Sequence, residues 1–157
     1  MRIAADGGWH YCGSPIGRPA LVKLFASILR KDPERYVLVT PVERVGIRVD
    51  DAPFLGVAMD VEGEGEGDQR RLVFTTNVED VVTVDAEHPL RFEPGAAGGL
   101  KPYVRVRGEL WALVKRAIYY DLVALGEVAP WQGEDWFGVA SAGVFFPMTR
   151  ASEIAGL

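Results

Sequence analysis

Two stretches of the chain place apolar residues three and four positions apart, which is the spacing of an amphipathic helix. The first stretch begins at Pro19, a residue that suits the first position of a helix, and ends at Asp32-Pro33. The second runs from Glu109 to about Leu125. The apolar positions are Leu21, Leu24, Phe25, Ile28 and Leu29, then Leu110, Leu113, Val114, Ala117, Ile118 and Leu122. We therefore expect two main helices.

Most of the remaining chain alternates apolar and polar residues at the two-residue period of a β-strand. The expected strands are 36–40, 42–49, 54–61, 71–76, 81–85, 90–93, 103–107, 136–140 and 144–148. Asp6-Gly7-Gly8 predicts a hairpin turn near the start of the chain, and Ser141-Ala142-Gly143 predicts another near its end. The acidic segment EGEGEGD at 62–68 predicts a solvated hairpin loop, and PGAAGGLKP at 94–102 predicts a linker.

Each expected helix is followed by a strand that starts with an aromatic residue, YVLVT at Tyr36 and FGVAS at Phe137. This repeat predicts an α+β protein of duplicated α/β subdomains with antiparallel sheets. We expect an N-terminal subdomain at 1–52 and a strand-rich C-terminal one at 53–157, packed as one globular unit. Because the two segments share little residue identity, chance convergence remains an alternative to duplication. A curved antiparallel sheet capped by a helix is another.

Composition and charge narrow the classes of function. Apolar residues make up 48% of the 157 positions and charged residues 25%, as in ordinary globular domains. The net charge of −5 opposes non-specific attraction to nucleic acid and to anionic membranes, so we expect neither as a partner. Cys12 is the only cysteine and no secretory signal is evident, which predicts a reduced, cytoplasmic location.

The sequence offers no catalytic constellation, and an enzyme is the less favoured interpretation. His10 and His88 are the only histidines, and no serine lies in a nucleophile elbow. His10, Cys12 and His88 are too few and too scattered to predict a metal site. Glycine-rich nucleotide motifs are missing as well, so no cofactor is expected.

One strand carries residues that suit an anion. Alternation along PYVRVRGEL places Tyr103, Arg105 and Arg107 on one face, where two guanidinium groups and a ring would form a row leading into the second helix. Arginine binds phosphate and carboxylate groups through paired hydrogen bonds. The alternative is a structural network in which these arginines pair with acidic residues, namely Glu43, Asp51 or Glu87.

Prolines fix the ends of neighbouring strands. Pro41 and Pro53 each remove a backbone donor, so the strands beside them end or bend there. Polar residues at strand ends are commonly displayed for binding on a rigid sheet. We expect a binding site at these ends beside the arginine row, formed by Thr40, Glu43, Asp51, Asn77, Tyr103, Arg105 and Arg107. The alternative is that Thr40 and Asp51 merely satisfy turn amides.

Several segments together resemble the bacterial family called domain of unknown function 1285. They are DGGWHYCGSPIGRPALVKLF, YVLVTPVERVGIRVDDAPF, FTTN, HPLR, PYVRVR and SAGVFF, from Asp6 to about Phe146. Ala142 stands where a second glycine is expected. The resemblance implies a duplicated α/β core and a C-terminal half superficially like pleckstrin-homology folds. It also implies a nucleotide-like ligand at the interface of the two halves and a role in signal transduction.

These observations favour a non-enzymatic module that binds a nucleotide-like anionic small molecule between its two halves. The alternative is a protein–protein interaction module without a small ligand. Large aromatic residues concentrate at such interfaces, and the chain has four tryptophans. They are Trp9, Trp111, Trp131 and Trp136.

Overall fold

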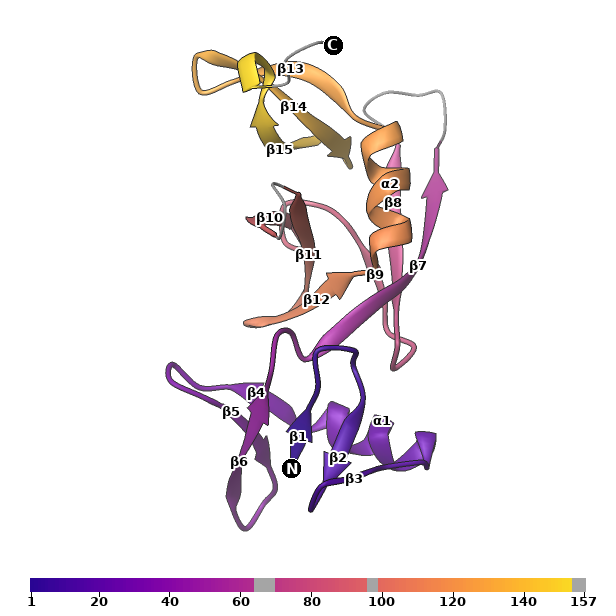
Figure 1. Cartoon of the computed structure of the whole chain (residues 1–157), viewed down its shortest axis with the longest axis vertical. Coiled ribbons are helices and arrows are strands. Elements are labelled where there is room, and N and C mark those ends of the chain that lie inside the picture. Colours follow the sequence, from indigo (N-terminus) through magenta and orange to yellow (C-terminus); the bar gives the residue numbers. More distant parts are fainter. Residues whose placement is uncertain (64–69, 96–98, 154–157) are drawn as a thin grey trace.

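The computed structural model of the chain describes residues 1–63, 70–95 and 99–153. Within them the chain is mostly β-strand with two α-helices, which confirms the predicted α+β class. Most of the acidic loop expected at 62–68, and the middle of the linker expected at 94–102, lie outside the described residues. Figure 1 shows the N-terminal half, residues 1–52, below the C-terminal half, residues 53–153.

The elements of the N-terminal half form one six-stranded sheet and one helix. They are β1 (Arg2–Ile3), β2 (Trp9–Tyr11), β3 (Ser14–Pro15), α1 (Pro19–Ser27), β4 (Leu29–Lys31), β5 (Tyr36–Val39) and β6 (Arg44–Val49). The strand order is β3-β2-β1-β6-β5-β4.

The described part of the C-terminal half contains a second six-stranded sheet, a second helix and a three-stranded sheet. The first of these sheets has the order β10-β11-β12-β7-β8-β9, and the last has the order β13-β14-β15. The elements are β7 (Phe54–Glu62), β8 (Arg71–Thr76), β9 (Val81–Thr83), β10 (Leu90–Pro94), β11 (Leu100–Arg107), β12 (Leu110–Val114), α2 (Arg116–Ala124), β13 (Glu127–Trp131), β14 (Glu134–Ser141), β15 (Val144–Arg150) and the 3-10 turn η3 (Ala151–Glu153).

A unit of meander, helix and meander occurs twice along the chain. It comprises β1 to β3, α1 and β4 to β6 in the N-terminal half, and β10 to β12, α2 and β13 to β15 in the C-terminal half. In the first unit the first and last strands, β1 and β6, pair with each other. In the second unit the first and last strands, β10 and β15, lie in contact. This repetition supports the predicted duplication. The likeness of the C-terminal half to pleckstrin-homology folds stays a prediction.

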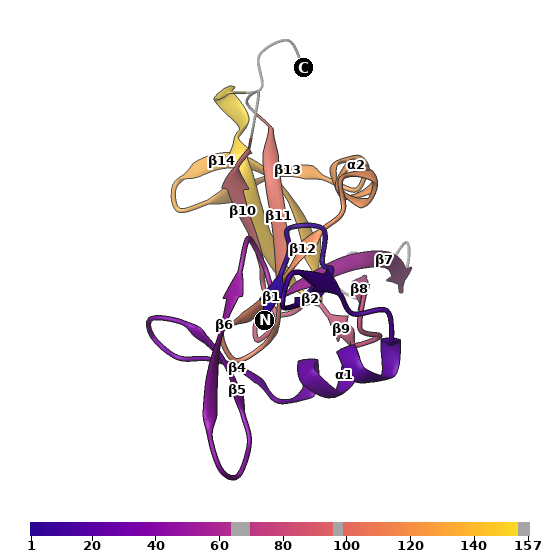
Figure 2. The same cartoon turned by 60° about the horizontal axis from the view of Figure 1, so that its bottom comes forward.

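The six-stranded sheets also share a topology. Each joins two antiparallel meanders through a parallel pair formed by its first and last strands, β1 with β6 and β7 with β12. Figure 2 shows α1 below β1 and β2, and α2 toward the opposite end of the molecule, beside β13. The linker between β6 and β7, residues 50–53, connects the two six-stranded sheets.

The first helix is shorter than predicted. It ends at Ser27, and Leu29–Lys31 forms β4 instead of a last helical turn. Pairing with β5 explains this, because Leu29 lies opposite Leu38 and is completely buried in the sheet. The Asp32-Pro33 signal that we expected to end the helix instead lies in the turn of a β-hairpin, where the Asp32 amide donates to the Arg35 carbonyl.

The predicted start of the second helix at Glu109 is wrong. Residues Leu110–Val114 form β12, and the helix begins at Arg116. Gly108, at a φ of 51°, turns the chain back into a hairpin with β11. Leu110, Ala112 and Val114 are buried while the residues between them are more exposed, so the segment follows a two-residue period. Apolar residues at 110, 113 and 114 fit a helix stripe as well, which is why the spacing misled us.

One hydrophobic core runs through both halves. Ile3, Trp9 and Leu29 from the N-terminal half belong to the same buried cluster as Phe54 and Phe74 from the C-terminal half. Phe54 is completely buried at the first position of β7, directly after the linker. The halves are therefore packed against each other rather than loosely tethered.

Candidate functional site

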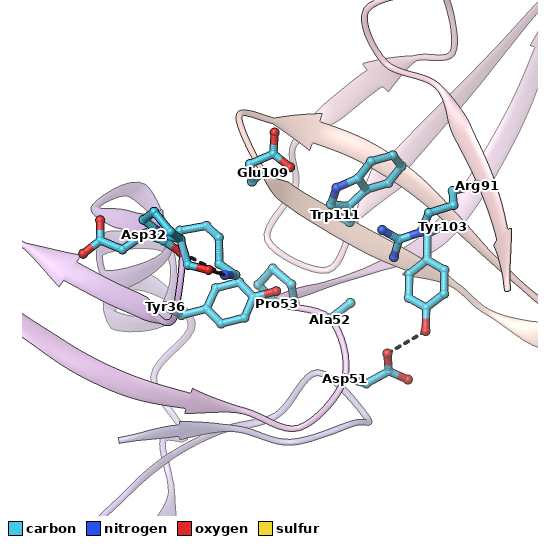
Figure 3. Close-up of a pocket in the computed structure, with 11 residues that line it drawn as sticks. Asp32, Tyr36, Asp51, Ala52, Pro53, Arg91, Tyr103, Glu109 and Trp111 are labelled. Atoms are coloured by element: carbon cyan, nitrogen blue, oxygen red, sulfur yellow. Dashed lines mark hydrogen bonds between the residues drawn. The ribbon is translucent and has the colours of Figure 1, made fainter.

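A cleft of about 470 Å³ opens between the two halves. The N-terminal half contributes the β4–β5 hairpin, with Lys31, Asp32, Pro33 and Tyr36, and the linker contributes Asp51, Ala52 and Pro53. The C-terminal half contributes Arg91, Tyr103, Glu109 and Trp111. In Figure 3, Tyr36 stands on one side of this cleft, while Trp111 and Arg91 stand on the other.

The wall on the C-terminal side is a cation held between two rings. The guanidinium carbon of Arg91 lies 4.6 Å from the ring centre of Tyr103 and 4.4 Å from that of Trp111. The register of the strands produces this arrangement. Arg91 on β10 lies opposite Tyr103 on β11, and Trp111 on β12 lies opposite Arg105, the next residue of β11 on the same face of the sheet. Such contacts hold a guanidinium in place while leaving its charge in the cleft.

Asp51 joins the linker to the floor of the cleft. It accepts a hydrogen bond of 2.6 Å from the Tyr103 hydroxyl and one of 2.5 Å from the Lys101 ammonium. Burial opposes ionisation of Asp51, but these two hydrogen bonds and the charges of Lys101 and Arg91 outweigh it and lower the pKa of the carboxyl. The hydrogen bond to Asp51 likewise raises the pKa of Lys101. The linker is therefore fixed to β11 by an ionised side chain.

Each carboxylate of the cleft is already held by a cation. Asp32 lies 3.0 Å from a terminal nitrogen of Arg44, and Glu109 lies 3.6 Å from one of Arg105. Asp51 is held by Lys101, as described above. These cations offset part of the negative charge that the three carboxylates would otherwise present to an anionic ligand.

The structure brings together only two of the residues that the sequence predicted for the site. Asp51 and Tyr103 meet in the cleft. Thr40 and Glu43 lie instead in the β5–β6 turn, where the Thr40 hydroxyl accepts a 3.1 Å hydrogen bond from the Glu43 amide. Asn77 lies between the halves, since its side-chain oxygen accepts from the Leu55 amide and its amide group donates to a carbonyl of the β1–β2 turn.

The predicted row of Tyr103, Arg105 and Arg107 does not form. A register shift between Arg105 and Arg107 interrupts the alternation of β11. Arg105 donates to the Gly108 carbonyl at 2.5 Å, within its own hairpin. Arg107 donates at 2.6 Å to the Ala26 carbonyl near the end of α1, and burial lowers its pKa. The second helix cannot reinforce an anion site here, because it starts well beyond this strand at Arg116.

Sequence reasoning missed the aromatic and basic residues of the cleft. The sequence predicts a short strand at Arg91 and a helix at Trp111, and neither indicates a cleft. Tyr36 and Lys31 flank a turn that the sequence predicts as a helix end, and the Lys31 ammonium lies 5.3 Å from the Tyr36 ring centre. Alternation from Leu110 to Val114 was the available signal for Trp111, whereas the pairing of Arg91 with Tyr103 depends on a register that one sequence does not show.

Family comparison accounts for nearly the whole chain. Residues 1–52 match the family described as domain of unknown function DUF1285, N-terminal domain. Residues 53–148 match protein of unknown function DUF1285, C-terminal domain. The chain belongs to the DUF1285 family. Within that family it is similar to a crystal structure from Silicibacter pomeroyi DSS-3, with 48% identity and a TM-score of 0.89 over 98% of this chain and 81% of that one.

A second DUF1285 crystal structure, from Shewanella baltica OS155, has 29% identity and a TM-score of 0.59. That similarity covers 78% of this chain and 89% of the other. No curated protein matches the chain. Within the described residues, no helix is long and apolar enough to cross a membrane, and no group of three or more His, Cys, Asp or Glu residues converges as metal ligands would.

Proposed function

We propose that this DUF1285 protein is a non-enzymatic binding module for a small, nucleotide-like anion that occupies the cleft between its halves. The observation that carries the proposal is the guanidinium of Arg91, held between Tyr103 and Trp111 at the mouth of a cleft of about 470 Å³. Clefts of roughly 300 to 1,000 Å³ are typical of small-molecule sites.

Aromatic rings and a cation suit the two parts of a nucleotide. A base stacks on an exposed aromatic face, and both Trp111 and Tyr36 are only half-buried in the cleft. A phosphate binds a guanidinium through paired hydrogen bonds. Within the described part of the chain, the carboxylate that pairs with Arg91 is Glu93, which lies 3.2 Å from Nε of Arg91 and leaves its terminal nitrogens for a ligand.

A binding role fits the cleft better than a catalytic one. Each of its three carboxylates lies beside a cation, which weakens it as a proton acceptor. Residues of both halves line the cleft, so a ligand there contacts both halves at once. A molecule bound across such a junction stabilises one relative placement of the halves, which is how a sensor in signal transduction would report its ligand.

The proposal is tested by thermal shift with adenosine monophosphate, adenosine triphosphate, nicotinamide adenine dinucleotide and cyclic diguanylate. A ligand at 100 times its dissociation constant adds about 2.7 kcal/mol to the free energy of unfolding. The test variant is Arg91→Ala, which we expect to weaken binding about tenfold, because a charge-assisted hydrogen bond contributes roughly 1.5 to 3 kcal/mol.

Arg150→Ala is a matched control. Arg150 also pairs with a glutamate at 3.2 Å, Glu134, and also lies over a tryptophan ring, Trp136, but it belongs to the third sheet. The control should keep the affinity of the parent protein. If none of the four compounds stabilises the protein, or if the two variants lose affinity equally, the cleft is not a nucleotide site. The interaction-module alternative would then take precedence.

A further inference from the structure

A second cavity, of about 800 Å³, lies next to the cleft in the C-terminal half. It is formed by the start of β11, the end of β12 and the first turns of α2, with Asp6 of the β1–β2 turn at its edge. Tyr103 and Leu113 are opposite each other on β11 and β12, and Leu113 is opposite Leu55 on β7, so these residues share one face of the sheet. The cavity and the cleft therefore lie along the same face.

Asp51 and Lys101 divide the two spaces. Lys101 lines the second cavity, while Asp51, to which it donates, lines the cleft. The charge of Lys101 is thereby largely engaged. A ligand in the second cavity must find its charge partners elsewhere.

The floor of the second cavity is apolar. Leu55, Leu100 and Leu113 line it, together with the ring of Tyr119 on α2. Leu100, Leu113 and Tyr119 are only half-buried, so each leaves part of its apolar surface open at the cavity, although Leu100 also packs against the core. Covering such a surface with a hydrocarbon or aromatic body is favourable at roughly 25 cal/mol per Å².

Two cations stand at the edge of this floor. Lys115 and Arg116 are exposed, and within the described residues neither has a carboxylate or hydrogen-bonding partner for its side chain. They flank the start of α2, which has no side-chain cap and no acidic residue in its first turn. Asp6 is the acidic residue of the lining, and its carboxylate accepts a hydrogen bond from the Gly8 amide. The unpaired positive charges thus lie together beside an apolar floor.

We propose that the second cavity is a binding site for an organic anion with an apolar body, such as an aromatic or aliphatic carboxylate or sulfonate. The body covers the floor of Leu55, Leu100 and Leu113, and the anionic group meets Lys115 and Arg116. The proposal goes beyond the nucleotide site and does not depend on it, since none of these five residues lines the cleft.

A pair of fluorescent probes tests this site. Anilinonaphthalene sulfonate has an apolar body and one negative charge, and phenylnaphthylamine has the same skeleton without the sulfonate. We expect the parent protein to bind the sulfonate at least about tenfold more tightly than the amine, because charge-assisted contacts contribute roughly 1.5 to 3 kcal/mol. We also expect added salt to weaken sulfonate binding, since exposed charges are screened.

The variant Lys115→Glu locates the probe, and Arg18→Glu is its matched control. Lys115 and Arg18 each occupy the position before the first residue of a helix, in extended backbone, without a side-chain cap. Charge reversal at both positions therefore changes helix stability in the same way. Only Lys115→Glu should weaken sulfonate binding, by about tenfold or more, while Arg18→Glu should stay within about twofold of the parent protein.

Each other result overturns the proposal. Equal affinities of the two variants would place the probe elsewhere, and equal affinities of the two probes would remove the anionic requirement. A failure of the sulfonate to bind the folded parent protein would show that the cavity is not such a site. Arg91→Ala separates this proposal from the nucleotide site, because it should leave sulfonate binding unchanged while it weakens nucleotide binding.

Discussion

The substitution Asp51→Asn removes one negative charge from the junction of the two halves without changing the size of the side chain. Asp51 accepts hydrogen bonds from Lys101 at 2.5 Å and from Tyr103 at 2.6 Å, and its side chain is only 19% exposed. An asparagine at this position has one oxygen and one NH₂ group. Its oxygen keeps one of the two donors, and the other donor then faces an NH₂ group that cannot accept.

The expected loss is about 2 kcal/mol in the free energy of unfolding at pH 7. A hydrogen bond to a charged group contributes roughly 1.5 to 3 kcal/mol. The lower part of this range applies because the Lys101 side chain is 40% exposed and its ammonium can be rehydrated. For a chain of 157 residues this corresponds to a fall in Tm of about 4 to 8 °C.

The loss of free energy of unfolding in Asp51→Asn should depend on pH. Because the folded-state pKa of Asp51 is lowered, its ionised form contributes stability above the unfolded pKa of about 3.9, and this contribution disappears as the pH falls through the folded-state value. Urea denaturation of the parent and of Asp51→Asn at pH 7, 5, 4 and 3 measures the difference. It should be full at pH 7 and 5 and should shrink below about pH 4.

Asp50→Asn is the matched control. Asp50 is the preceding residue in the chain, and its side chain is 20% exposed, close to the 19% of Asp51. Its partners Arg2 and Arg48 are more exposed than Lys101, at 51% and 81%, and no tyrosine among the described residues donates to it. Asp50→Asn should therefore lower the free energy of unfolding less than Asp51→Asn, because ion pairs with exposed cations contribute little. Equal losses for the two variants, or a difference between parent and Asp51→Asn that does not change with pH, would refute the assignment of Asp51 as the charged anchor of the linker.

Two further predictions concern packing between the halves. Arg107→Ala should lower the free energy of unfolding by about 1 to 3 kcal/mol and leave nucleotide binding intact, because Arg107 donates to a carbonyl near the end of α1. Arg105→Ala should lower the free energy of unfolding less, because Arg105 donates within its own hairpin. Equal losses for the two variants in urea denaturation would contradict this prediction. In the same assay, Gly7→Ala should lower the free energy of unfolding more than Gly13→Ala. Both glycines have a positive φ, 85° and 81°, but a Cβ at Gly7 would lie 2.8 Å from Leu55, and one at Gly13 meets open space. Similar losses would show that only the backbone conformation matters.

Local chemistry made the hairpins predictable. Asp6-Gly7-Gly8 and Ser141-Ala142-Gly143 turn the chain where the sequence indicated, and Ala142 and Gly143 adopt φ values of 52° and 78°. Two consecutive positive φ values are typical of a type I′ hairpin turn. The α+β class was predictable from local periodicity, but β4 and β12 were not, because their apolar spacing also fits the helices beside them.

The cleft was less predictable, because its residues meet through long-range pairing. Arg91 meets Tyr103 only because β10 and β11 align in one register, and Trp111 joins them only because residues 110–114 form a strand. The register shift after Arg105 sends Arg107 to α1, and no local pattern in the sequence marks it. Tertiary pairing therefore decided which of the predicted polar residues share a site.

The four tryptophan side chains offer the most direct test of the proposed nucleotide site. Trp9 is buried against Phe25 in the core, Trp131 and Trp136 pack edge to face in the third sheet, and Trp111 lines the cleft. Two-dimensional proton–nitrogen spectra resolve one indole NH signal for each of them. On titration with adenosine monophosphate or nicotinamide adenine dinucleotide, the Trp111 signal should shift and saturate while the other three stay in place. Saturating shifts at Trp9, Trp131 or Trp136 with an unmoved Trp111 signal, or no shifts with either compound, would contradict the account.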